Sequence, residues 1–221
     1  MKYRILCFGD SNTWGYNAVN EERYNEEIRW TRRLGRMLGE DFEIIEEGLS
    51  GRNAVCDDPL KEGLNGLSYF YPCLMTHKPI DLVIIMLGTN DAKERFSLTS
   101  YNIAMGITRL AEKARHSESG RGDSDPEILV VTPAPIGQGY AKCPAFLSMG
   151  RESDVKTEEL HEHLSGMISQ CGFHYLNAGE HLEMGTTDHM HLDEEGHKKM
   201  AELLQKKIRE IMTAVQGQVM N

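Results

Sequence analysis

The sequence has no hydrophobic run long enough to cross a membrane. A membrane-spanning helix needs about 20 consecutive apolar residues, and charged residues, which make up 26% of this chain, interrupt every apolar stretch before that length. The first β-rich run begins as early as Tyr3, which leaves no room ahead of it for a secretory signal. We therefore expect a cytoplasmic protein that has no membrane partner.

Basic residues and paired cysteines are also scarce. Asp and Glu outnumber Lys and Arg by 34 to 24, for a net charge of −10, whereas nucleic-acid binding depends on basic side chains. We therefore expect no nucleic-acid partner. The cysteines are five in number, an odd count, and are widely scattered. This pattern favours reduced thiols over a disulfide framework or a zinc site.

The hydrophobic pattern alternates between strands and helices. Apolar, β-rich runs predict strands at 3–8, 42–45, 81–87, 128–132 and 173–177. Helical spacing predicts helices at 29–38, 67–75, 103–114, 152–171 and 194–215. Such alternation is typical of a parallel sheet covered on both faces. We expect an α/β fold in a single domain over residues 1–221, with a polar loop at 117–125 and an irregular surface segment at 133–150.

Polar residues gather where three of the predicted strands end. The first strand is followed by GDSNT at 9–13, the second by LSGRN at 49–53 and the third by GTND at 88–91. Open α/β sheets bind their ligands at the carboxyl ends of the strands. In a flavodoxin-like order, 2-1-3-4-5, the first strand lies between the second and the third. Ser11 would then be flanked by Gly51 on one side and Asn90 on the other.

A serine hydroxyl becomes a useful nucleophile only when a base takes its proton and a third group orients the base. The segment DHMH at 188–191 offers both groups. Asp188 and His191 are three residues apart on a turn, so the carboxylate can hold one imidazole nitrogen and leave the other for Ser11. The backbone N–H groups of Ser11 and Gly51 and the amide of Asn90 could bind the negative oxygen of a tetrahedral intermediate.

These blocks resemble the SGNH (GDSL-type) hydrolase family in identity and in order. The stretches CFGDSNTWG, EEGLSGRN and DLVIIMLGTND are similar to its arylesterase and acyltransferase branch. The resemblance implies a three-layer α/β/α fold with a five-stranded parallel sheet, no metal, no organic cofactor and acyl transfer through an acyl-serine. It implies Ser11, Asp188 and His191 as the triad, and Ser11, Gly51 and Asn90 as the oxyanion hole.

Two positions depart from the family pattern or leave a choice. Asn12 stands where the family's name would put Leu, at a position whose side chain does no chemistry. Gly48 is a rival to Gly51 as the backbone donor of the second block. The substrate is expected to contact Asp10, Ser50 and Trp14; Trp14 could instead belong to the core.

Other interpretations of the same residues stay open. His189, His191 and His197, with Asp188 and Asp193, also resemble a metal cluster, which would make the protein a metal hydrolase. A non-catalytic flavodoxin-like binding module would keep the fold without the chemistry. A second Gly-Asp-Ser, at 122–124, lies in the polar loop and is interpreted as a turn.

The joint pattern predicts a serine esterase acting on small esters with short acyl chains, with acyl transfer as a second outcome. A carbohydrate acetylesterase or a thioesterase is the alternative within the same chemistry. We expect Trp14 and the apolar residues of the 133–150 segment to enclose a narrow pocket; those residues are Ile136, Tyr140, Phe146 and Leu147. We also expect a homo-oligomer in which neighbouring subunits shield that segment.

Overall fold

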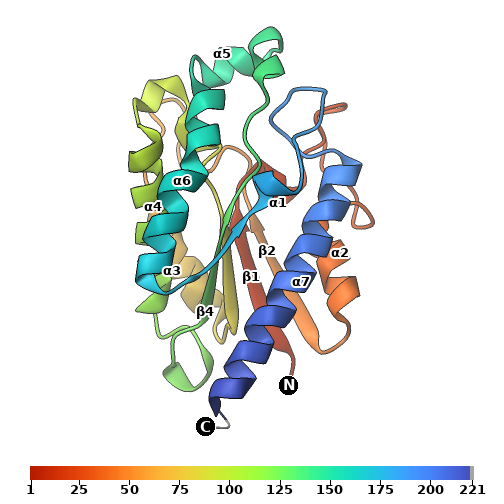
Figure 1. Ribbon diagram of the computed structural model, residues 1–221, viewed down its shortest axis with the longest axis vertical. Coiled ribbons are helices and arrows are strands. Elements are labelled where there is room, and N and C mark those ends of the chain that lie inside the picture. The colour runs from red at the N-terminus through yellow and green to blue at the C-terminus, as the bar shows by residue number, and fades with distance from the viewer. Residues whose placement is uncertain (220–221) are drawn as a thin grey trace.

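The computed structural model describes residues 1–219, and its five strands form one all-parallel sheet. The strands are β1 (Tyr3–Gly9), β2 (Phe42–Gly48), β3 (Leu82–Met86), β4 (Glu127–Thr132) and β5 (His174–Asn177). Their order is β2-β1-β3-β4-β5, which confirms the order predicted from the sequence. Because every strand runs the same way, all carboxyl ends meet at one edge of the sheet, the upper edge in Figure 1.

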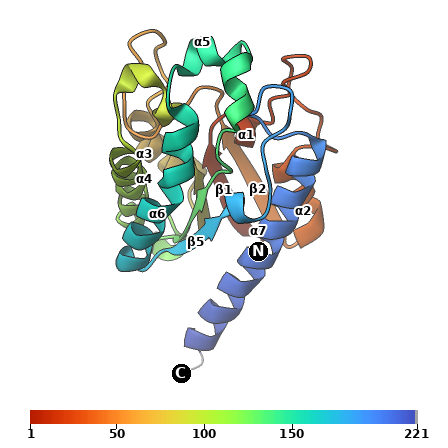
Figure 2. The ribbon, with the colours of Figure 1, turned by 45° about the horizontal axis from the view of Figure 1, so that its top comes forward.

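Helices cover both faces of the sheet and give the predicted three layers (Figures 1 and 2). One face carries α2 (Trp30–Leu38) and α7 (Glu194–Val219); the other carries α3 (Gly66–His77), α4 (Ser100–Arg115) and α6 (Ser153–Cys171). Two short helices lie at the carboxyl edge, α1 (Ser11–Trp14) and α5 (Ala145–Met149). Short 3-10 turns complete the chain: η1 (Asn90–Ala92), η2 (Glu94–Phe96), η3 (Arg121–Asp123), η4 (Gln138–Lys142) and η5 (Ala178–Glu180).

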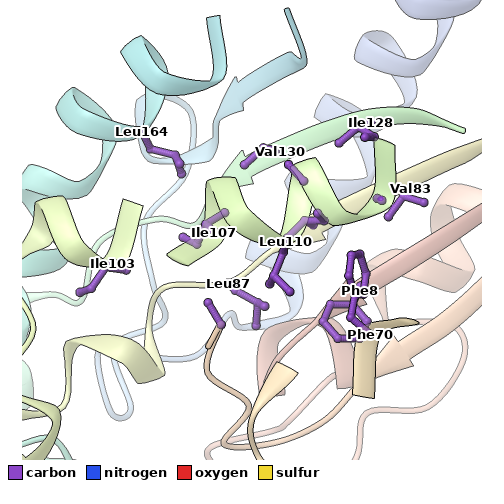
Figure 3. Close-up of a cluster of buried hydrophobic side chains, with 14 of the residues drawn as sticks. Phe8, Phe70, Val83, Leu87, Ile103, Ile107, Leu110, Ile128, Val130 and Leu164 are labelled. Carbon is purple, nitrogen blue, oxygen red and sulfur yellow. The ribbon is translucent and has the colours of Figure 1, made fainter. Parts of the chain in front are cut away.

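The central strands supply a hydrophobic core to each face. In β1, Leu6 and Phe8 join the cluster under α3, α4 and α6, whereas Ile5 and Cys7 join the one under α2 and α7. Figure 3 shows the first cluster, in which the rings of Phe8 and Phe70 lie 4.6 Å apart. Burial of a side chain of this size stabilises the fold by about 1.5–3 kcal/mol. This two-sided burial explains the nearly continuous apolar sequence of the middle strands.

Some elements extend beyond their predicted ends. The edge strand β2 continues through two glutamates to Gly48, because the Glu46 carboxylate is held by Arg29 at 3.0 Å and by Arg32 at 2.8 Å. Helix α4 begins three residues early, since Thr99 caps it in a reciprocal pair with Asn102. Among residues 1–219, no helix is both long and apolar enough to span a membrane.

The segment 133–150 corrects the prediction of an irregular surface excursion. It forms η4 and α5, and Ile136 and Tyr140 are buried in the core beneath α6. The segment folds back on itself because the Tyr140 hydroxyl donates to the Gly150 carbonyl at 2.9 Å and its ring packs on Phe146. Leu147, in contrast, is 90% exposed. Two of the four expected pocket residues therefore serve the core.

Helix α1 lies directly on β2 because Gly48 has no side chain. A Cβ on Gly48 would lie 2.2 Å from the Trp14 backbone nitrogen and 2.6 Å from the Thr13 carbonyl carbon. Both contacts are to backbone, which cannot rotate away. The absence of a side chain at Gly48 thus determines how closely α1 approaches the sheet.

We expect Gly48→Ala to lower the free energy of unfolding by about 1–3 kcal/mol, because the added methyl must displace α1. The matched control is Gly166→Ala in α6, where a Cβ would meet nothing within 4 Å. That control should stabilise the helix by about 0.5–1 kcal/mol. Urea denaturation measures both; equal effects from the two substitutions would contradict this role of Gly48.

Candidate active site

Ser11 is the first residue of α1, at the end of β1. Its helix is capped by Asp10, whose Oδ1 accepts from the Asn12 backbone N–H at 2.9 Å. Backbone N–H groups in the first turn of a helix have no carbonyl partner within it, so the Ser11 N–H is available to an acceptor. The Ser11 residue is 6% exposed. A strand-to-helix turn therefore presents both a hydroxyl and a backbone donor at the sheet edge.

The turn at 188–191 brings an imidazole and a carboxylate to Ser11. His191 Nε2 lies 2.9 Å from Ser11 Oγ, and His191 Nδ1 lies 2.6 Å from Asp188 Oδ2. Because a carboxylate only accepts, the ring proton belongs on Nδ1, which leaves Nε2 free to accept from the Ser11 hydroxyl. The three side chains form one continuous hydrogen-bonded chain.

Asp188 is held in its ionised form. Burial alone would raise the pKa of this carboxyl, but the hydrogen bond and charge of His191, with the backbone N–H groups of Met190 and His191, lower it below its ordinary value. Both of those N–H groups donate to Asp188 Oδ1 at 3.0 Å. Oδ1 of Asp188 therefore stabilises the turn that carries it, and Oδ2 orients His191.

The other two histidines of the segment point elsewhere. His189 packs on the backbone of η4, so closely that a Cβ on Gly139 would lie 2.2 Å from its Nε2. His197 is 0% exposed, and its Nδ1 accepts from the Trp30 N–H at 3.3 Å.

Within the described part of the chain, the one trio with potential metal-ligand atoms within 4.8 Å of one another is Glu47, Cys73 and His77. The His-rich segment therefore does not assemble the metal cluster that its sequence resembles.

The turns after β2 and β3 flank Ser11 as the strand order requires. Asn90 begins η1, and its Nδ2 lies 3.5 Å from Asp10 Oδ2. Asp10 is 1% exposed, and burial raises the pKa of its carboxyl. The two oxygens of Asp10 are directed at the Asn12 N–H and the Asn90 amide. It therefore caps α1 and orients Asn90.

Gly51 lies in the loop after β2 with a φ of +89°, a value that favours glycine. The next residue, Arg52, is buried and ties this loop to the sheet: its guanidinium donates to the carbonyls of Gly9 and Glu47 and stacks 4.0 Å above the Phe8 ring. Ser50 is exposed on the same loop. The buried guanidinium thus fixes the loop that carries Gly51.

Comparison with known proteins shows the family of this chain. Residues 7–199 match the model of the GDSL-like lipase/acylhydrolase family. The chain belongs to this family. It is an esterase of the GDSL (SGNH) type, a hydrolase that acts on ester bonds.

Individual relatives agree with this placement. The structure of M. smegmatis aryl esterase is 40% identical over 94% of this chain and 99% of that one, with a TM-score of 0.89. A carbohydrate acetylesterase from Sinorhizobium meliloti is 36% identical over 95% and 100%, with a TM-score of 0.90. An acetylxylan esterase from Xylanibacter ruminicola is 25% identical over 91% of this chain. The chain spans only 42% of that last relative.

In this GDSL-type esterase, three residues beside Ser11, His191 and Asp188 are not indicated by the sequence pattern. The Tyr16 ring lies 4.4 Å from the His191 ring. Asn12 bonds to the backbone of the His191 turn, and Arg52 supports the Gly51 loop. Trp14, one of the expected substrate contacts, is half-buried with the Arg23 guanidinium 5.4 Å from its ring centre. Trp14 thus lies outside the core clusters.

Asp91 joins two of the esterase's loops. Its Oδ1 accepts from the Ala54 N–H at 2.7 Å, whereas Oδ2 is buried and has no hydrogen-bond partner among the described residues. Burial, only partly offset by that N–H, raises the pKa of Asp91 from 3.8 to about 7. The folded protein therefore favours the protonated form of this carboxyl.

This raised pKa predicts a pH-dependent stability. Between the unfolded and folded pKa values the folded state holds one more proton, so this group's contribution to the free energy of unfolding falls as the pH rises from about 4 to about 7. We expect Asp91→Asn to gain stability relative to the wild type over that range and to level off above it. Urea midpoints measured at a series of pH values test this.

Asp58 provides the control for that series. The hydrogen bond from Arg95 lowers the pKa of Asp58, so Asp58→Asn should destabilise the protein without such a trend between about pH 5 and 8. A difference between Asp91→Asn and the wild type that does not vary with pH would show that Asp91 is ionised in the fold.

Proposed function

We propose that Ser11 is the nucleophile of this esterase, His191 its base and Asp188 the group that orients the base. The observation that carries the proposal is the unbroken chain from Ser11 Oγ to His191 Nε2, 2.9 Å, and from His191 Nδ1 to Asp188 Oδ2, 2.6 Å. In the first step Ser11 Oγ attacks the ester carbonyl carbon while its proton passes to His191 Nε2. Asp188 stabilises the imidazolium that forms.

The same groups then complete the acylation and carry out the deacylation. His191 returns the proton to the leaving alkoxide, the carbon–oxygen bond of the ester breaks, and an acyl-serine remains. Water then gives a proton to His191 as it attacks the acyl carbon. The bond from that carbon to Ser11 Oγ breaks, His191 returns the proton to Oγ, and the acid is released. An alcohol in place of water would give transfer to a new ester.

The developing oxyanion would be bound by the Ser11 N–H, the Gly51 N–H and Asn90 Nδ2. The choice of Gly51 over Gly48 rests on their surroundings. Gly48 belongs to β2, pairs with Gly9 across the sheet and packs against the backbone of α1. Gly51 lies beyond the strand, in the loop that Arg52 fixes, and its φ of +89° is one that residues other than glycine rarely adopt. Asp10 holds Asn90 for this task.

For the substrate we propose small esters with short acyl chains. The proposal is supported by the burial of Ser11, by the half-buried Trp14 three residues further along the chain and by the Tyr16 ring that packs against His191. Similarity to an aryl esterase supports simple aromatic or alkyl esters. Similarity to a carbohydrate acetylesterase and an acetylxylan esterase supports acetylated sugars as the second candidate.

Substitution of the histidines tests the assignment of the base. His191→Ala should lower kcat on p-nitrophenyl acetate by about 10³-fold or more, because Ser11 loses its proton acceptor. His189→Ala, the matched control two residues away, should lower it far less, because that ring packs on η4. Ser11→Ala should remove turnover and leave the unfolding transition unchanged. An essential His189 would overturn the assignment.

A series of p-nitrophenyl esters from acetate to decanoate tests the acyl site. If the site is narrow, kcat/KM should fall as the chain lengthens, since overpacking costs about 1–3 kcal/mol. Acetylated xylose, assayed beside p-nitrophenyl acetate, separates the two substrate candidates. Added primary alcohol should give a transfer ester; preference for decanoate would contradict the narrow site.

A further inference from the structure

We propose that Asn12 is a positioning residue, which fixes the His191 turn to the helix that carries the nucleophile. This role rests on the proposed function of Ser11 and His191. Asn12 is the immediate neighbour of Ser11 in α1 and is 2% exposed. It would hold the base at its working distance from the serine without touching the substrate.

The Asn12 side chain forms hydrogen bonds to the backbone on both sides of His191. Its Oδ1 accepts from the Leu192 N–H at 2.9 Å, and its Nδ2 donates to the Met190 carbonyl at 3.2 Å. Met190 and Leu192 are the residues immediately before and after His191. One amide group therefore spans the residue that contacts Ser11.

The pairing requires a side-chain amide. A backbone N–H can only donate and a carbonyl can only accept, so the two contacts need an acceptor and a donor on the same side chain. An ionised Asp would keep the acceptor for Leu192 and lose the donor for Met190. Leu, which the GDSL name puts at this position, fills a similar volume and can make neither bond. We call these two bonds from the Asn12 side chain, to Met190 and to Leu192, the clamp. The clamp is thus a feature by which this chain departs from the family's pattern.

The other bonds of the turn do not replace this one. Asp188 Oδ1 holds N–H groups within the turn, and the Gly185 and Gly137 N–H groups donate to the carbonyls of His191 and His189. Those bonds give the turn its shape and attach it to η4. Within residues 1–219, the hydrogen bonds between the turn and α1 are those of Asn12 and that of Ser11 itself.

The other end of the clamp is anchored in the core. The Trp30 indole N–H donates to the Asn12 carbonyl at 2.9 Å, and Trp30 is buried at the start of α2. Asn12 is thus fixed to the body of the protein by its backbone and to the catalytic turn by its side chain. Without the side-chain bonds, the Ser11–His191 contact would be the one hydrogen bond left between the turn and α1 among the described residues. Displacement of a catalytic group by about 1 Å can cost about 10²-fold in rate.

Asn12→Leu tests the clamp, with Thr13→Val as the matched control. Thr13 is the next residue of α1, and its buried hydroxyl has no partner among the described residues. The first measurement is amide hydrogen exchange, which reports the bond directly. The Leu192 N–H should exchange about tenfold or more faster in Asn12→Leu and unchanged in Thr13→Val.

The second measurement compares kcat/KM for an alkyl acetate with that for p-nitrophenyl acetate. An alkoxide needs a proton from His191 to leave, whereas p-nitrophenolate leaves without one. A displaced His191 should therefore lower kcat/KM by about 10- to 100-fold for the alkyl ester and by less for the nitrophenyl ester, with KM little changed. A structural role alone would lower both equally, through less folded protein.

Asn12→Asp is the second variant, in case Asn12→Leu does not fold. It keeps the bond to Leu192 and loses the one to Met190, so an intermediate effect is expected. Unchanged exchange at Leu192 in Asn12→Leu, or equal losses on the two esters in either variant, would overturn the clamp. If Ser11→Ala still hydrolysed both esters, the proposed function would fail, while the exchange data would still decide the clamp.

Discussion

The candidate site depends on the position of β1 between β2 and β3 in a wholly parallel sheet. That order brings the ends of three strands side by side, and each strand continues into a turn that carries one part of the candidate site. The absence of a side chain at Gly48 then lets α1 lie against the backbone of β2. The hydroxyl and the N–H of Ser11 therefore lie at the carboxyl edge of the sheet, close to the flanking loops and to the turn before α7. No single loop could place these groups alone.

This arrangement buries carboxyl groups, and the burial of an ionised carboxyl costs free energy. Asp10, Asp91 and Asp188 lie around one nucleophile, and burial disfavours the ionised form of each. Only Asp188 has a pKa below its ordinary value, because His191 and two backbone N–H groups outweigh burial. Asp10 and Asp91 have raised pKa values and hold backbone at the site. The carboxylate that must stay ionised to orient the base is thus the one with the strongest partners.

Much of the fold, and the meeting of Ser11, His191 and Asp188 at one edge of the sheet, could be predicted from the sequence. Continuous apolar strands, polar residues at the strand ends and an Asp-x-x-His turn are local patterns with few structural alternatives. The ends of β2 and α4 were not predictable, because they depend on the Glu46–Arg29 pair across elements and on a reciprocal cap. The segment 133–150 was misjudged because its prolines and glycines hide Tyr140, which anchors it to the core. The bonds of the Asn12 side chain could not be predicted, because its partners lie about 180 residues away.

The central claim of this account is that Ser11 becomes acylated. The most direct test is to quench the enzyme during turnover of an acetyl ester and to map the modified peptide by mass spectrometry. The account predicts one acetyl group per chain, on the peptide that contains Ser11, and its slow loss in water. Turnover without any covalent acetyl, or an acetyl group on Ser50 or Ser124 that forms and decays at the rate of turnover, would contradict it.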